Sequence, residues 1–208
     1  MNNKSFFITF EGPEGAGKST QAGVVMEHLK SQGMDVVKTR EPGGVSISEQ
    51  LREILLNPSS TISPRTELLL YAAGRAQHTS ELIMPALKAG KSVLCERYTH
   101  ASLAYQGYGR QLDKDLVNML NEVATMGLKP DLTIMFNISA EEGLGRVASS
   151  DRTFDRLESE NIEFHRRVRE GYLALAAKDP NVELVDATLP EKELSKEIIK
   201  ILKRRNIC

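Results

Sequence analysis

The sequence predicts an α/β fold in three layers, a central parallel sheet of five strands with helices on both faces. Five short β-rich segments alternate along the chain with segments of helical periodicity, the pattern of a parallel sheet covered by helices. The length of 208 residues is enough for one core but short for two ordinary enzyme domains. Residues 1–208 are therefore expected to form a single domain, with ligands beyond the carboxyl ends of the strands.

The chain begins as strand, loop and helix. An apolar run over Ser5–Phe10 predicts the first strand, which stops at Glu11, and a helical pattern starts near Ser19. Asp35–Thr39 predicts the second strand, which ends just before a proline and two glycines. Both strands therefore end in segments that cannot continue a regular element.

Two helices are expected before the third strand. Ser46 and Glu49 form a capping-box pattern for a helix that runs to about Leu56. Pro64 suits the first position of a long helix over about 65–89, which Pro85 would disturb.

The rest of the chain repeats the alternation. Ser139 and Glu142 form a second capping-box pattern, for a helix that breaks down at 149–151. Further strands are expected at 92–95, 131–137 and 182–186, and further helices at 99–126, 157–178 and 189–205. The segment 146–157, interrupted by charged and flexible residues, is a candidate for a mobile insertion.

Composition excludes several classes of function. Lys and Arg number 27 against 28 Asp and Glu, so a net charge of −1 provides no global cationic field for nucleic acid or an anionic membrane. No apolar run approaches the roughly 18 residues of a membrane span, and the first residues lack the apolar core of a signal peptide. Cys95 and Cys208 show neither a disulfide framework nor a metal-ligand spacing. We expect a cytoplasmic protein that binds neither nucleic acid nor membrane.

The strongest motif is a glycine-rich loop from Gly12 to Ser19, which fits the phosphate-binding loop pattern at every fixed position. It follows a predicted strand and opens a predicted helix, so backbone N–H groups and the helix N-terminus would face phosphate. Lys18 would contact the β- and γ-phosphates of ATP, Ser19 would ligate Mg²⁺, and Thr20 could donate to the α-phosphate. The loop predicts nucleotide binding but does not name a reaction.

Arginines near strand ends indicate a second phosphate. Arg40 and Arg97 follow predicted strands, and Arg75 lies in the helix that contains Tyr71. Guanidinium groups bind phosphate oxygens in bidentate fashion, so a converging set would hold a second phosphorylated molecule, although each one alone is compatible with an ordinary surface charge. The chain also lacks the Asn-Lys-x-Asp segment that reads guanine, which argues against a Ras-like switch.

Six motifs together resemble the thymidylate kinase family. They follow the family's order through most of the chain: Glu11–Ser19, Thr39–Gly44, Tyr71–Arg75, Glu96–Tyr98, Ser102–Gly107 and Asp155–Glu158. The resemblance implies the P-loop kinase fold with a short lid at about 146–157, and transfer of the ATP γ-phosphoryl group to dTMP, giving dTDP and ADP in dTTP synthesis. It also implies Mg²⁺ with ATP, and a cytoplasmic homodimer.

The resemblance assigns substrate contacts to the matching residues. ATP would be held by Gly12, Pro13, Glu14, Gly15, Ala16, Gly17, Lys18, Ser19, Thr20 and Arg146, the last stacking on adenine. The dTMP contacts would be Glu14, Glu41, Pro42, Arg52, Tyr71, Arg75, Arg97, Ser102, Tyr105 and Gln106. Tyr71 would lie against thymine, Tyr105 would crowd the 2′ position of a ribonucleotide, and Ser102 and Gln106 would reach the polar edge of the base.

The catalytic residues implied are Lys18, Arg97, Glu14, Arg152 and Arg156. Phosphoryl transfer needs positioning and charge neutralisation more than a nucleophilic side chain, so no general base is assigned. The phosphate loop lacks the arginine that one subgroup of the family has there. By resemblance to the other subgroup that role moves to the lid, where either Arg152 or Arg156 would act as closure excludes water.

Magnesium would be held by Ser19 and, through water, by Glu96. The family usually has Asp at the position of Glu96, whose side chain is one methylene longer.

Two other functions stay open from the sequence. Another nucleoside monophosphate or deoxynucleoside kinase could share nearly the same motifs, whereas a non-enzymatic ATP-dependent switch would have no need of a second cluster of phosphate-binding arginines.

Overall fold

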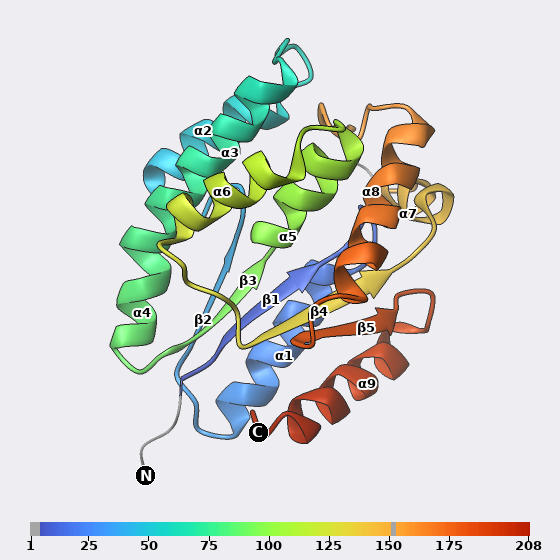
Figure 1. Ribbon diagram of the computed structural model, residues 1–208. Helices are drawn as coiled ribbons and strands as arrows, with labels where there is room; N and C mark the ends of the chain where they lie inside the picture. The colour runs from blue at the N-terminus through green and yellow to red at the C-terminus, as the bar shows by residue number, and fades with distance from the viewer. Residues whose placement is uncertain (1–4, 151–152) are drawn as a thin grey trace.

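A computed structural model describes residues 5–150 and 153–208, and its centre is a five-stranded parallel sheet in the order β2-β3-β1-β4-β5 (Figure 1). The strands are β1 (Phe7–Glu11), β2 (Val36–Arg40), β3 (Ser92–Glu96), β4 (Leu132–Asn137) and β5 (Val182–Asp186). All four pairings are parallel. The predicted fold class is confirmed, with β5 at the predicted bounds and the other strand ends within two residues of the predicted ones.

Helices connect and cover these strands. They are α1 (Lys18–Ser31), α2 (Ser46–Leu56), α3 (Pro64–His78), α4 (Met84–Lys88), α5 (Thr99–Ser102), α6 (Lys114–Thr125), α7 (Ala140–Ala148), α8 (Ile162–Ala176) and α9 (Glu191–Arg204). Two π-helical segments lie among them, η1 (Thr79–Ile83) and η2 (Leu103–Gly109). None of the helices in the described ranges is long and apolar enough to cross a membrane.

Alternate residues of β1 supply the two faces of the core. Ile8 and Phe10 pack with residues of α1 and α9 on one face, while Phe7 joins a cluster with Val93 and Ile83 on the other. All five residues of β1 are buried, as a central strand covered on both faces requires. Figure 1 shows α1 and α9 side by side on one face of the sheet, with α3, α6 and α8 on the other.

The helix predicted over about 65–89, with a disturbance at Pro85, is confirmed in extent: helical backbone runs from Pro64 to Lys88, as α3, η1 and α4 in succession. Ser63 caps α3 by accepting a hydrogen bond from the N–H of Thr66, and Pro64 stands in the first turn as predicted. The helix then widens into η1 before α4 begins. Pro85 explains the break, because it has no N–H to donate to the preceding turn of a regular α-helix.

The predicted caps of two other helices turn out differently. The capping box at Ser46 is wrong: Val45 is the N-cap of α2, and the Glu49 carboxylate accepts from the N–H of Gly44 and from Arg40. Ser139 does cap α7, by accepting a hydrogen bond from the N–H of Glu142. The Glu142 carboxylate, however, pairs with an arginine of the same helix instead of completing the box.

Two predicted helical stretches are interrupted. The stretch 99–126 is divided into α5, η2 and α6. The helix predicted from 157 begins only at Ile162, where Asn161 accepts a hydrogen bond from the N–H of Phe164. Before it, the Asp155 carboxylate accepts from the N–H groups of Leu157 and Glu158, which holds a turn in place of the first helical turns. The side chains of Asp155 and Asn161 therefore compete locally with helix formation.

The strand register places the site. Glu96 at the end of β3 is opposite both Phe10 of β1 and Arg40 of β2. The three strands therefore end together, and the loops after Glu11, Arg40 and Glu96 leave the sheet at one edge. This is where the ligand crevice of an open parallel sheet lies.

Candidate active site

Two adjoining clefts lie at this edge. The base cleft, as we call the larger, has a volume of about 330 Å³ and is lined by Glu14, Ser19, Arg40, Glu41, Pro42, Arg52, Leu56, Tyr71, Arg75, Glu96, Arg97, Ala101, Ser102, Tyr105, Gln106, Asp155, Leu157 and Glu158. The loop cleft is lined by Glu14, Gly15, Ala16, Gly17, Lys18, Ser19, Thr20, Glu96, Arg146, Val147 and Ser150. Glu14, Ser19 and Glu96 belong to both, so the two clefts meet at these residues.

The phosphate loop has the backbone that its glycines permit. Gly15 and Gly17 have φ values of 66° and 82°, a region that favours glycine. A Cβ on Gly15 would also collide with the backbone of Gly143 in α7, so the loop and α7 lie against each other without space for a side chain. The loop cleft follows from this arrangement, because α7 forms its second wall.

Lys18 begins α1 and folds back over the loop. Its Nζ donates hydrogen bonds of 3.1 Å to the Gly12 carbonyl and 2.6 Å to the Pro13 carbonyl. Burial, followed by the nearby positive charge of Arg97, lowers the pKa of Lys18 to about 8, against the opposing effect of three glutamates. The ammonium is therefore short of anionic partners, which phosphate oxygens could supply.

Arg97 lines the base cleft and contacts the phosphate loop. Its Nη2 donates to Glu14 Oε1 at 2.7 Å, and its Nη1 donates to the Gly12 carbonyl at 2.9 Å and to the Tyr172 hydroxyl at 3.0 Å. The Tyr105 hydroxyl donates to the same Glu14 oxygen at 2.7 Å. Burial raises the pKa of Glu14, but the charges of Arg97 and Lys18 outweigh it and lower the pKa to about 2. Glu14 is thus a carboxylate that orients Arg97.

Ser19 and Glu96 lie together where the clefts meet. The Ser19 hydroxyl donates to Glu96 Oε2 at 2.5 Å. A hydroxyl and a carboxylate oxygen at the mouth of a phosphate loop are the hard oxygen donors that Mg²⁺ prefers, so the two residues fit that ion. The longer side chain of Glu96 still reaches Ser19, and a role of Glu96 in holding Mg²⁺ stays a prediction.

Arg75 is more deeply buried than the sequence suggested. Its guanidinium donates to Glu41, Ser102, Asn121 and the Tyr98 carbonyl at 2.7–2.8 Å, and its side chain is only 2% exposed. It lines the base cleft, but protein acceptors already occupy most of its N–H groups. Contact between Arg75 and a base or phosphate stays a prediction.

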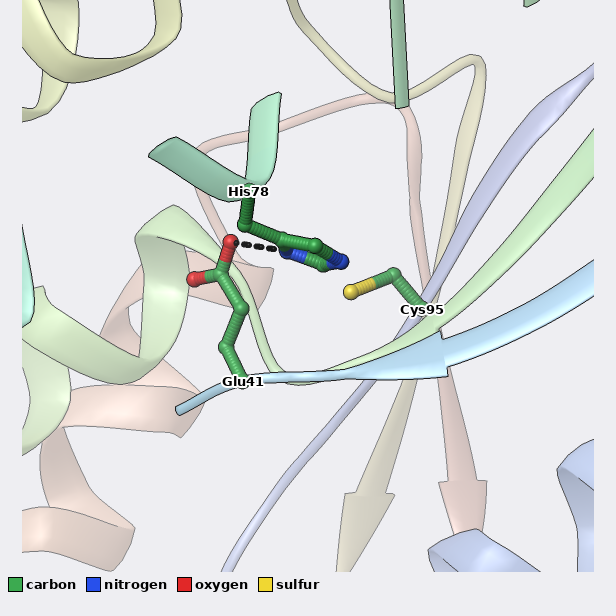
Figure 2. A group of neighbouring side chains, drawn as sticks. All are labelled: Glu41, His78 and Cys95. Atoms are coloured by element: carbon green, nitrogen blue, oxygen red, sulfur yellow. Dashed lines mark hydrogen bonds and ion pairs between the residues drawn. The ribbon is translucent and has the colours of Figure 1, made fainter. Parts of the chain in front are cut away.

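Glu41, His78 and Cys95 form a buried group whose ligand atoms lie within 4.8 Å of one another (Figure 2). Glu41 accepts from Arg75 and is 3.0 Å from His78 Nδ1, while His78 Nε2 is 2.7 Å from the hydroxyl of Thr39. Burial raises the pKa of the Cys95 thiol well above its ordinary value, so it stays protonated, and Arg75 adds a positive charge alongside. Glu41 and His78 are satisfied by each other, by Arg75 and by Thr39, and the Cys95 thiol donates to the Arg97 carbonyl, a poor setting for a cation.

The remaining predicted dTMP contacts line the base cleft. Tyr71 packs against the cluster that contains Tyr105 and Phe164. Pro42 follows β2, and its carbonyl accepts a 2.8 Å hydrogen bond from Arg52 of α2. Arg52 therefore lies over the entrance that Pro42 forms, and both line the cleft as the resemblance implies.

The predicted lid residues are divided between the clefts and the core. Arg146 lines the loop cleft and donates to the Ala187 carbonyl and to Glu142. Arg156 donates to the Leu55 carbonyl and pairs with Glu67 at 2.7 Å. Arg152 lies outside the described residues. The role of each arginine in transfer stays a prediction.

Several residues at the site were not expected from the sequence. Buried Glu11 accepts from the N–H of Tyr98 and from the hydroxyl of Tyr172, which in turn contacts Arg97. A glutamate that ends a mostly apolar strand is a pattern that could have revealed Glu11. Nothing in the local sequence singles out Tyr172 or Asn121, because long-range packing brings them to the site.

Comparisons with known proteins agree with this arrangement. A family model described as thymidylate kinase matches residues 10–198. The chain is 49% identical to a thymidylate kinase of Pelotomaculum thermopropionicum, covering 95% of this chain and 92% of that protein. It is 48% identical to a thymidylate kinase of Bacillus pumilus, covering 94% of each. The crystal structure of a thymidylate kinase from Ehrlichia chaffeensis has a TM-score of 0.77 at 32% identity, covering 95% of this chain and 98% of that one.

Proposed function

The chain belongs to the thymidylate kinase family and transfers the γ-phosphoryl group of ATP to dTMP, giving ADP and dTDP for dTTP synthesis, and we propose how its residues carry out this reaction. ATP occupies the loop cleft and dTMP the base cleft. The observation that carries this proposal is that the two clefts meet at Glu14, Ser19 and Glu96, so two phosphorylated molecules can face each other there.

The loop cleft suits the donor. Backbone N–H groups of residues 12–17 and the N-terminus of α1 surround the β- and γ-phosphates, while Thr20 lies at the α-phosphate. As the nucleotide enters, Lys18 Nζ gives up its hydrogen bonds to the Gly12 and Pro13 carbonyls and donates to phosphate oxygens instead. Arg146, on the α7 wall, lies against the adenine ring.

The base cleft suits dTMP. Its lining combines the aromatic ring of Tyr71 and the proline ring of Pro42 with polar groups of Ser102 and Gln106. Thymine lies between the rings with its polar edge toward the amide and hydroxyl. The phosphate of dTMP then lies toward Arg97, at the junction with the loop cleft.

Transfer depends on charge and alignment. The acceptor phosphate is already largely deprotonated near neutral pH, so the protein needs no general base. Arg97, oriented by Glu14, neutralises charge between donor and acceptor, and Lys18 does so on the γ-phosphate. When Mg²⁺ is bound by Ser19 and by water on Glu96, it screens the charge of the ATP phosphates.

The segment 146–157 is proposed as the lid of a single kinase domain spanning 1–208. Its arginines would complete the charge around the transferring group, with Arg152 or Arg156 supplying the last cation. Arg156 is held by Glu67 and the Leu55 carbonyl, so its participation needs those contacts to be exchanged on closure.

We further propose a cytoplasmic homodimer. Exposed apolar side chains occur on α3 and on the two helices that pack against it, α2 and α6: Ile47, Ile54, Leu69, Met119 and Val123. Ile47 and Ile54 are two helical turns apart, and Met119 and Val123 one turn apart, so each pair shares a face of its helix. A second copy of the chain would cover these residues.

An acceptor panel tests the reaction. ADP release from Mg²⁺–ATP would be measured with dTMP, dUMP, UMP, dCMP, dGMP and no acceptor. Turnover with dTMP well above the others supports the proposal. Equal activity on another monophosphate would support kinase activity but contradict selectivity for thymine. ATP hydrolysis that does not depend on an acceptor would contradict both kinase activity and selectivity for thymine.

A further inference from the structure

Glu67 of α3 has a buried carboxylate next to the base cleft. The sequence alone assigns no role to Glu67. It is fully inaccessible to solvent, and both its oxygens are used. Its partners are Gln106 Nε2 at 2.9 Å, Arg110 Nε at 3.2 Å, Arg110 Nη2 at 3.0 Å and Arg156 Nη1 at 2.7 Å. Of these partners, Gln106 lines the base cleft.

The surroundings keep Glu67 ionised. Burial raises its pKa, but hydrogen bonds from Arg110, Gln106 and Arg156 outweigh burial and lower the pKa below its ordinary value. An ionised carboxylate only accepts hydrogen bonds, whereas a side-chain amide donates through nitrogen and accepts through oxygen. Gln106 must therefore turn its nitrogen toward Glu67.

The amide oxygen of Gln106 is consequently directed away from Glu67. Within residues 5–150 and 153–208, this oxygen accepts no hydrogen bond, although the side chain is almost completely buried. It is nevertheless not among the fully buried atoms without a partner in these ranges, so it is open to the base cleft, where a ligand can donate to it. The base cleft is the space through which such a donor can arrive.

We infer that Glu67 is a positioning residue that fixes the Gln106 amide with its oxygen toward the acceptor base, so that the cleft selects a pyrimidine with an N–H at ring position 3. Thymine and uracil have that N–H, while cytosine has a lone pair there. A turned amide would present nitrogen to cytosine, but it would then place its oxygen against the Glu67 carboxylate. The inference rests on the proposed location of dTMP in the base cleft.

The main test compares the wild type with Glu67→Gln. The substituted amide has nearly the same shape but can donate as well as accept, so Gln106 loses its fixed orientation. The ratio of kcat/KM for dTMP over that for dCMP is expected to fall roughly tenfold or more, chiefly through a higher KM for dTMP. A smaller fraction of folded enzyme lowers both values of kcat/KM by the same factor, so it leaves their ratio unchanged. Glu163→Gln, at an exposed surface ion pair, is the matched control and should leave the ratio unchanged.

A second variant separates positioning from packing. Arg110→Gln removes two hydrogen bonds to Glu67 but leaves the contact between Glu67 and Gln106. It is expected to lower thermal stability while keeping the dTMP to dCMP ratio. If Arg110→Gln lowers the ratio as much as Glu67→Gln, the network acts only through packing and the inference is overturned.

Gln106→Leu distinguishes failure of this inference from failure of the proposed binding mode. If it leaves the ratio unchanged, the base does not lie against Gln106 and the binding mode is wrong. If it lowers the ratio but a folded Glu67→Gln does not, the binding mode stands and the role of Glu67 is overturned.

A measurement on the wild type covers the case in which Glu67→Gln does not fold. In ¹⁵N-labelled protein, the side-chain amide protons of Gln106, assigned with Gln106→Leu, should exchange slowly with solvent both with and without dTMP. Rapid exchange in the dTMP complex would show that the amide is not held by Glu67 and would overturn the inference.

Discussion

The carboxylate of Glu14 accepts a 2.7 Å hydrogen bond from Arg97 Nη2, across more than eighty residues of chain. Glu14 belongs to the phosphate loop and Arg97 to the end of β3, so the contact ties the loop to an arginine that lines the base cleft. The backbone of Arg97 has a φ of 65°, a left-handed conformation that directs its side chain over the loop.

Glu14→Gln should therefore misplace Arg97. Removing the negative charge weakens a charge-assisted hydrogen bond at the reaction centre, and kcat/KM for dTMP should fall roughly tenfold to a hundredfold. Steady-state kinetics with both substrates would measure it. Glu141→Gln, at a surface pair with Arg166, is the control. Wild-type kinetics in Glu14→Gln would contradict the orienting role.

Acid stability provides a second test of Glu14. Its pKa in the folded chain is about 2 against an ordinary value of 4.5, so the folded state binds fewer protons than the unfolded state between these values. The stabilisation is present above about pH 4.5 and is lost as the pH falls toward 2. Urea unfolding at several pH values should show a smaller loss of stability in Glu14→Gln over this window. An equal loss in both proteins would contradict the low pKa.

Lys18 predicts an alkaline limit to activity. Its pKa in the free enzyme is about 8, and the charged ammonium is the form that stabilises phosphate. The value of kcat/KM for ATP should therefore fall as the pH rises through 8, by about tenfold per unit at higher pH. Bound phosphates favour the charged form, so the fall in kcat should occur at higher pH. Lys18→Arg keeps its charge at alkaline pH, so the kcat/KM for ATP of that variant should not fall as the pH rises through 8. A wild-type kcat/KM for ATP that stays constant up to pH 9.5 would refute a Lys18 pKa near 8.

Two glycines of α7 offer a matched pair of substitutions. A Cβ on Gly143 would meet the backbone carbonyl of Glu14, whereas a Cβ on Gly145 would have nothing within 4 Å. Gly143→Ala should displace the phosphate loop and raise the KM for ATP roughly tenfold. Gly145→Ala should leave kinetics unchanged and stabilise the helix by up to about 1 kcal/mol. Similar ATP kinetics in both variants would show that the loop tolerates movement of α7.

The proposed role of Glu96 in holding Mg²⁺ can be tested by shortening its side chain and by removing its charge. Glu96→Asp is expected to keep most activity, while Glu96→Ala should lose at least about tenfold, because the carboxylate near the Mg²⁺–phosphate group is removed. Initial rates over a range of Mg²⁺ concentrations would show a higher requirement in Glu96→Ala. Wild-type turnover in that variant would end the metal role of Glu96.

The proposed dimer face predicts a change of assembly. Val123 is 71% exposed on α6, so an acidic side chain there costs the monomer little. Val123→Asp should shift the chain from dimer toward monomer in sedimentation measurements. Lys129→Asp, on the loop after α6, is a control for added negative charge. A wild type that sediments as a monomer at all concentrations would refute the homodimer.

Local pattern was enough for the sheet and the phosphate loop, whereas the expected dTMP contacts came from the family resemblance. Period-two and period-3.6 hydrophobic spacing reports which face of an element is buried, and the run from Gly12 to Ser19 has a backbone that few other sequences could adopt. The strand ends follow from the parallel register, which brings Arg40 and Glu96 to one edge. The order of these motifs carried the family resemblance.

Only the tertiary structure decided what each charged side chain contacts. Arg75 lies among Glu41, Ser102 and Asn121, and Arg156 pairs with Glu67, although both sequence contexts resemble ordinary helix surfaces. Helix breaks such as η1 likewise arise where local hydrogen bonding and packing compete. Hydrophobic periodicity encodes burial, but hydrogen-bond partners far apart in sequence are set by how helices pack across the sheet.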